Sequence, residues 1–120
     1  MDRRASSPLR VPFVRRCLLD FGDGVGQEAF IVNINVSGAY VAKDELPTLG
    51  QWVICRFGLP DSEREISVEG NVVWVNPRQQ HPVHSLPPGF GLKFLRLSSE
   101  SRQTIERLVV TYLAGRPRPQ

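Results

Sequence analysis

The chain has 120 residues, of which 41% are apolar and 22% are charged, a composition that allows one compact domain with a buried core and excludes a disordered tract. No segment approaches the ~20 consecutive apolar residues that cross a bilayer, and the N-terminus lacks the apolar stretch of a secretion signal, so we expect no membrane insertion and a cytoplasmic location. The net charge is +3, but residues 17–115 hold eight basic and eleven acidic residues, a net of −3, which excludes a generally basic surface.

An arginine-rich arm precedes the first predicted strand. Its arginines before that strand are Arg3, Arg4 and Arg10, and a Ser-Ser-Pro step at residues 6–8 interrupts any periodic pattern. A guanidinium binds phosphate or carboxylate through two parallel hydrogen bonds, so the arm indicates a localised anion site, with a merely solubilising arm as the alternative. The predicted organisation is a flexible arm over 1–10, an ordered domain over 11–114 and a disordered tail over 115–120.

Six segments alternate apolar with polar residues and predict β-strands. They lie at about 11–21, 27–35, 39–41, 53–59, 65–74 and 89–95. The FGDGVG segment after the first one predicts a hairpin turn. Strict alternation along the second segment puts neighbouring residues on opposite faces. We expect one face to carry Phe30, Val32 and Ile34. We expect the other face to carry Ile31, Asn33 and Asn35.

One helix is predicted at the C-terminal end. Its apolar residues recur at helical spacing and form a single stripe: Ile105, Leu108, Val109, Tyr112 and Leu113. Ser98 can cap its start, and Gly115 and Pro117 end it. Six short strands followed by one helix, without crossover helices between strands, predict a mostly β fold: a small, partly closed barrel with the helix covering an opening.

The sequence contains no recognisable catalytic or metal-binding constellation. His81 and His84 lie in a proline-rich loop without a nearby cysteine or carboxylate, which favours exposed loop residues over a metal pair. Cys17 and Cys55 lie far apart in alternating segments, which predicts buried thiols and neither a disulfide nor a metal site. We therefore expect a noncatalytic protein without catalytic residues, bound metal or cofactor.

A candidate ligand site lies at the end of the second predicted strand. Asn33 and Asn35 share a predicted face, and each amide presents donors and an acceptor that suit the edge of a nucleobase. Gly38 would let a ligand approach the backbone closely. The alternative is that the two asparagines and the glycine simply build the turn that ends the strand.

The order of these segments resembles the bacterial PilZ domain from about Arg10 to Leu113. The resemblance is carried by RVPF at 10–13, VNINVSGAYV at 32–41, VEGNVVWVNP at 68–77 and PPGFGLKFL at 87–95. It implies a six-stranded antiparallel β-barrel with one C-terminal helix that acts as a receptor for cyclic di-GMP.

The resemblance also implies which residues bind that ligand. In the family, an RxxxR arm clamps phosphates and guanines. Arg10 matches its second arginine and Ser6 stands at the first, so Arg3 or Arg4 could substitute only if the arm loops out. The family's D/N-x-S-x-x-G segment contacts guanine. Asn33 and Gly38 match it with Asn35 in place of serine, whereas the alternative register from Asn35 and Ser37 puts Tyr40 at the glycine position.

Three functions compete at this point. The first is a noncatalytic cyclic di-GMP receptor whose site comprises Arg10, Arg4, Arg3, Asn33, Asn35 and Gly38, and which signals by ordering its arm and changing a surface offered to a protein partner in motility or signalling. The second is an adaptor of the same fold that binds only proteins, through the loop 76–88 and the helix face. The third, nucleic-acid binding, is disfavoured by the acidic body and the shortage of clustered aromatic residues.

Overall fold

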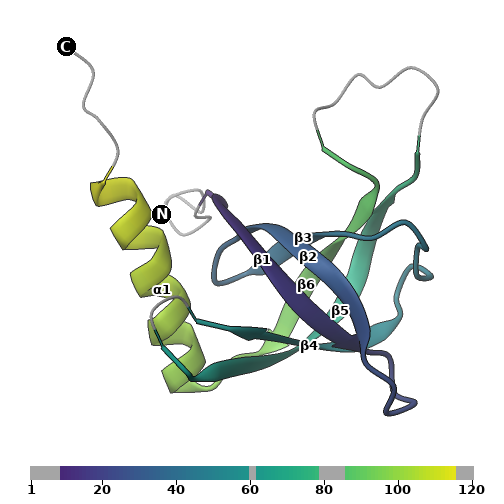
Figure 1. Ribbon diagram of the computed structural model, residues 1–120, viewed down its shortest axis with the longest axis horizontal. Helices are drawn as coiled ribbons and strands as arrows, with labels where there is room; N and C mark the ends of the chain where they lie inside the picture. The colour runs from purple at the N-terminus through teal and green to yellow at the C-terminus, as the bar shows by residue number, and fades with distance from the viewer. Residues whose placement is uncertain (1–8, 60–61, 79–85, 116–120) are drawn as a thin grey trace, which may run out of the picture.

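The computed structural model describes residues 9–59, 62–78 and 86–115, and these form a closed barrel with one helix beside it (Figure 1). The elements are β1 (Val11–Asp20), β2 (Gln27–Ile34), β3 (Gly38–Ala42), β4 (Trp52–Gly58), β5 (Glu65–Asn76), β6 (Gly89–Arg96) and α1 (Ser99–Ala114). Around the barrel the strand order is β1-β2-β3-β6-β5-β4, and every neighbouring pair is antiparallel. The predicted fold class, a mostly β six-stranded antiparallel barrel with a C-terminal helix, is confirmed.

The barrel interior is filled by the inward-facing residues of all six strands. Leu19, Val53 and Val68 illustrate the pattern, because each is buried while its neighbours along the strand are exposed or half-buried. The hairpin between β1 and β2 is held by Asp20, whose Oδ1 accepts hydrogen bonds from the backbone N–H groups of Gly22 (2.9 Å) and Gly24 (3.1 Å). Both glycines have positive φ angles, which explains their presence in this turn.

A β-bulge in β2 overturns the predicted division of its two faces. Ile31 pairs with Val41 and Asn33 pairs with Tyr40, so Val32 is an extra residue without a partner on β3. One extra residue reverses the alternation beyond it. Ile31 and Ile34 are both fully buried. The prediction that Phe30 and Ile34 share a face is therefore wrong, since Phe30 is 47% exposed on the outer surface.

Helix α1 lies at one end of the barrel and packs against β1 and β5. Ser98 caps it, as predicted, by accepting a hydrogen bond from the Ser101 N–H (3.0 Å). Ile105 is the fully buried member of the predicted apolar stripe, whereas Tyr112 and Leu113 are 38% and 46% exposed. The stripe is thus buried only near its beginning, and its C-terminal part is surface. Among the described residues, no helix has the length and apolarity needed to span a membrane.

The two cysteines lie side by side in the barrel interior, on the neighbouring strands β1 and β4. Cys17 pairs with Phe57, and Cys55 pairs with Leu19 two residues along the same ladder. Both are free thiols with at most 2% of their surface exposed, which confirms the prediction of buried thiols. A hydrogen bond with Cys17 and burial both raise the pKa of the Cys55 thiol well above its ordinary value.

The raised pKa of Cys55 predicts a loss of stability in mild alkali. Above pH ~8.5, the ordinary pKa of a cysteine, the unfolded chain releases a proton that the folded thiol retains, so the free energy of unfolding should fall as the pH rises further. Urea titrations at about pH 7.5 and 9.5 measure this change, and Cys55→Ala should lose part of it. Equal stability of the wild-type protein at both pH values would contradict the assignment.

Candidate functional site

Arg10 lies immediately before β1, and its guanidinium rests against the backbone of Gly38 at the start of β3. A Cβ atom placed on Gly38 would lie 3.3 Å from Arg10 Nη2, which shows how closely the two residues approach. Desolvation lowers the pKa of Arg10 from its ordinary value, although an arginine keeps its proton at neutral pH. The Arg10 side chain makes no hydrogen bond or ion pair with any residue in the described ranges. Within the part of the chain that the structure describes, Arg10 is a partly desolvated charged group whose donors are unused.

The turn beside Arg10 is built by Asn35. Its side chain is buried, and Oδ1 accepts hydrogen bonds from the N–H groups of Ser37 (2.7 Å) and Gly38 (3.0 Å). The Asn35 N–H donates to the Gly38 carbonyl (2.9 Å), and the Ser37 carbonyl accepts from the Phe94 N–H on β6 (2.9 Å). The turn is therefore closed by its own hydrogen bonds and attached to β6 through Ser37, and the side-chain oxygen of Asn35 is used within the turn.

Asn33 lies on the outer face of β2, between Pro12 of β1 and Tyr40 of β3. Its Oδ1 is buried without a hydrogen-bond partner among the described residues. β2 ends at Ile34, between the two asparagines, and the Asn35 Oδ1 is used within the turn, so the two amides do not present one shared edge. The structure brings Arg10, Asn35 and Gly38 together. Asn33 lies outside this cluster, on β2 beside Tyr40 of β3.

The other arginines near the arm do not join this cluster. Arg15 donates to the carbonyl oxygens of Gly58 (3.0 Å) and Leu59 (3.1 Å) at the end of β4, which is a structural role. Arg16 lies over the ring of Phe30, 5.9 Å from its centroid. Arg3 and Arg4, predicted as ligand-binding residues, lie outside the described residues, as do His81 and His84.

An aromatic pair that the sequence analysis missed lies next to the cluster. Tyr40 packs against Trp74 of β5 with ring centroids 5.4 Å apart, across Gly91 of β6, which has no side chain to separate them. The Tyr40 hydroxyl donates to the Pro87 carbonyl and accepts from Asn76 Nδ2 (3.0 Å). Only the register of three strands brings these residues together, so no local pattern could have identified them.

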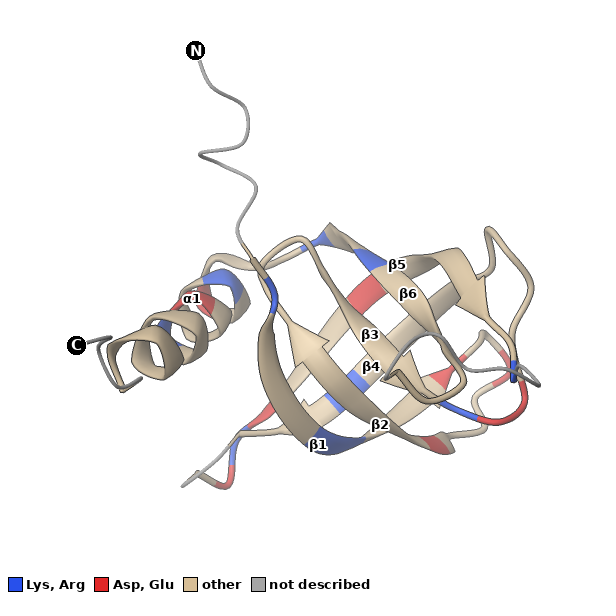
Figure 2. Ribbon diagram, turned by 90° about the horizontal axis from the view of Figure 1, so that it is seen from above, with Lys and Arg blue, Asp and Glu red and all other residues tan. Residues whose placement is uncertain are grey.

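Charge on the described surface is mixed, without a continuous basic stripe. Figure 2 shows basic segments interspersed with acidic ones around the barrel. No group of three or more His, Cys, Asp or Glu residues suited to a metal ion occurs within the described ranges. The positive charge of the candidate site is therefore confined to the surroundings of Arg10.

A family model described as PilZ domain matches residues 2–111. The chain belongs to the PilZ family. The family consists of noncatalytic receptor and adaptor domains for cyclic di-GMP. No curated protein matches the chain at a significant level.

A solved PilZ domain has a similar structure. It is the PilZ domain of CeSA from a cellulose-synthesizing bacterium, which matches with a TM-score of 0.60 and 12% sequence identity over 88% of this chain and 99% of that one. At this level of identity the likeness establishes the shared barrel and helix. In this chain Asn35, Ser37 and Gly38 form one turn beside Arg10.

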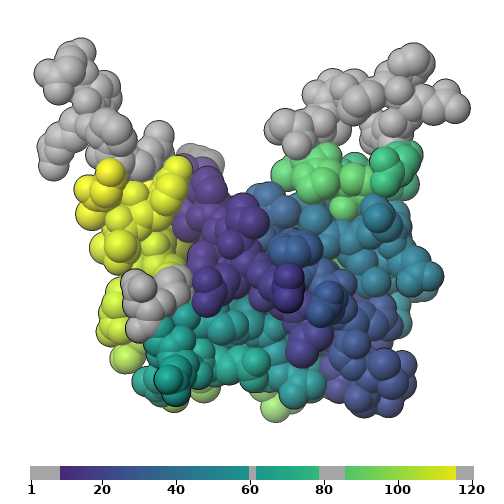
Figure 3. All heavy atoms as spheres, in the orientation of Figure 1, coloured from purple at the N-terminus to yellow at the C-terminus, as the bar shows by residue number. Residues whose placement is uncertain are grey.

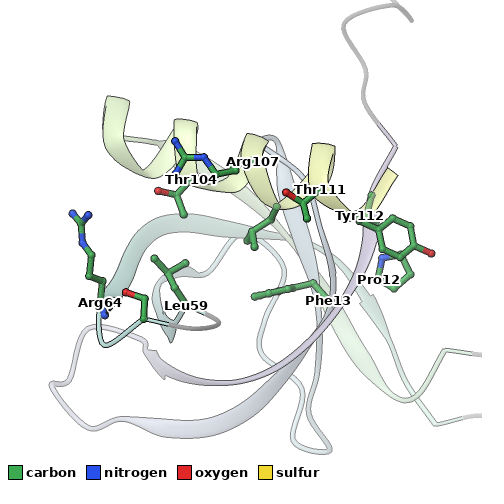
Figure 4. A pocket seen from close by; sticks show the side chains of 11 residues that line it. Pro12, Phe13, Leu59, Arg64, Thr104, Arg107, Thr111 and Tyr112 are labelled. Carbon is green, nitrogen blue, oxygen red and sulfur yellow. Dashed lines mark hydrogen bonds between the residues drawn. The ribbon is translucent and has the colours of Figure 1, made fainter. Parts of the chain in front are cut away.

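A groove of about 550 Å³ lies between α1 and the barrel in this PilZ domain. Figure 3 shows α1 beside β1 on the surface of the molecule. Figure 4 shows Phe13 and Leu59 on the floor of the groove, Arg64 and Arg107 toward one end and Tyr112 at the other. Arg64 pairs with Glu100, and exposed apolar residues of α1, including Val110 and Leu113, continue beyond the groove. The lining of the groove does not include Arg10, Asn35 or Gly38, although Val11 and Pro12, which follow Arg10, belong to it.

The close approach at Gly38 predicts a large cost for any side chain there. A Cβ would lie 2.1 Å from the Leu92 carbonyl oxygen, so Gly38→Ala must displace β3 from β6 and should lower the free energy of unfolding by about 1–3 kcal/mol. The matched control is Gly26→Ala, whose Cβ meets only Leu18 at 3.5 Å and should change stability by less than about 0.5 kcal/mol. Equal effects of the two changes in urea unfolding would contradict the packing described.

Proposed function

We propose that this protein is a noncatalytic receptor for cyclic di-GMP. The observation that carries the proposal is the Arg10 guanidinium, which rests on Gly38 with unused donors beside the Asn35 turn. A phosphodiester is bound well by a charged donor that offers two parallel N–H groups. Arg10 supplies this donor, and the missing side chain at Gly38 lets its guanidinium lie against the backbone.

The remaining contacts to the ligand would come from Asn33, from the Asn35 turn and from the arm. Asn33, with an unpartnered Oδ1, lies beside Tyr40 and can offer its amide to a guanine edge after a small side-chain rotation. Asn35 and Gly38 would act through the turn they build, by presenting backbone to the base. Arg3 or Arg4 would approach from the arm, and binding would order the arm and so change the surface offered to a partner in motility or signalling.

This proposal predicts a measurable affinity that depends on Arg10. Calorimetry with purified protein should detect cyclic di-GMP binding, and ~100 μM ligand should raise the Tm. Arg10→Ala should weaken binding by about ten- to a hundredfold, because a charge-assisted hydrogen bond is worth about 1.5–3 kcal/mol.

The matched control for Arg10→Ala is Arg16→Ala. It removes the same charge from the same end of the chain, but Arg16 lies over Phe30 and away from Gly38, so binding should change by less than about threefold. Absence of both heat and thermal stabilisation in the wild-type protein would end the receptor hypothesis for this chain.

The second candidate is an adaptor that does not bind the nucleotide. Its support is the groove beside α1 together with the exposed apolar residues Val110, Tyr112 and Leu113. One comparison distinguishes the receptor from the adaptor. An adaptor would bind its partner equally well with or without cyclic di-GMP and after Arg10→Ala, but would lose the partner after Leu113→Glu.

A further inference from the structure

Ser6 stands where the resemblance to the PilZ family implies an arginine that clamps phosphate together with Arg10. A second cation is available from a different part of the fold. Lys93 on β6 is the direct cross-strand partner of Gly38 on β3. Lys93 is therefore paired with the residue against which the Arg10 guanidinium lies.

The orientation of Lys93 follows from its neighbours and from the ladder. Leu92 is fully buried and Phe94 is 8% exposed, so Lys93 between them points outward and is exposed. Directly paired residues of an antiparallel ladder project from the same face, with Cβ atoms about 4.5–5.5 Å apart. Because Gly38 has no side chain, the Arg10 guanidinium can lie against its backbone, and Lys93 is the exposed residue paired with that position on β6.

No described acid neutralises this pair. The ion pairs of the described residues are Lys43–Glu45, Arg64–Glu100 and Arg78–Asp44, none of which involves Arg10 or Lys93. The partner of Lys93 on β5 is Asn71, an uncharged residue whose Nδ2 donates to the Gly50 carbonyl (2.9 Å). Two like charges on a shared surface without a counter-ion favour an anion between them.

We propose that Arg10 and Lys93 together clamp one phosphate of cyclic di-GMP above Gly38, and that Lys93 supplies the positive charge that Ser6 does not. This inference rests on the proposed function. Arg10 provides the planar fork for two phosphate oxygens, and Lys93 provides a movable point charge from the other side. The arm then contributes one cation, Arg10, and β6 contributes the second, Lys93.

The test is calorimetry with cyclic di-GMP on the whole chain, using Lys93→Ala, Lys93→Arg and Arg96→Ala. Lys93→Ala should weaken binding about tenfold or more, and Lys93→Arg should restore most of it. Arg96→Ala is the matched control, because it removes a charge from the same strand at a position paired with Glu69, and should change affinity less than about threefold. Thermal unfolding should give the same Tm for the wild-type protein, Lys93→Ala and Lys93→Arg without ligand, which separates the loss of a contact from the loss of the fold.

The outcomes distinguish this inference from the proposed function. Wild-type affinity in Lys93→Ala, or an equal loss in Arg96→Ala, overturns the clamp and leaves the receptor intact. If the wild-type protein binds no cyclic di-GMP, the receptor hypothesis fails. The clamp is then tested separately by adding inorganic pyrophosphate and recording NMR spectra of the protein. Shifts of the Gly38 amide and Lys93 side chain that vanish in Arg10→Ala would support a phosphate clamp for another ligand, and unchanged spectra would overturn it.

Discussion

The absence of a side chain at Gly38 is the constraint on which the candidate site depends. At this point the chain leaves the Asn35 turn, enters β3 and passes so close to the Leu92 carbonyl that no Cβ fits. The same bare backbone provides the surface on which the Arg10 guanidinium rests, and the same ladder sets Lys93 opposite. One glycine thus links the packing of the barrel to the position of two cations, so the fold and the proposed site cannot be altered independently there.

Much of the fold could be predicted from local patterns. Alternation in the strands, the glycine-rich hairpin and the helical spacing after Ser98 each correspond to an observed element. The division of faces in β2 could not be predicted, because the bulge at Val32 arises from pairing with β3 and leaves no local signal. The extent of burial along α1 could not be predicted either. Its apolar spacing is helical, but only Ile105 is fully buried, Val109 is partly buried against the core, and Leu113 lies at the surface.

The candidate site was partly predictable for the same reason. Arg10 and Gly38 were identified from residue type and order, and the structure brings them together. The predicted pairing of Asn33 with Asn35 failed in its geometry, since the Asn35 amide carbonyl is used within the turn while Asn33 faces Tyr40. Lys93 carries no local signal at all. It lies 55 positions from Gly38 in the chain, and only the pairing of β3 with β6 makes them neighbours.

A structure of the protein bound to cyclic di-GMP tests the central claim most directly, by crystallography or by intermolecular NMR contacts. Our account predicts one phosphate above Gly38, within hydrogen-bonding distance of both the Arg10 guanidinium and the Lys93 ammonium, with a guanine edge toward Asn33. A ligand seated instead in the groove between Phe13 and α1, or a phosphate that contacts neither cation, would contradict it.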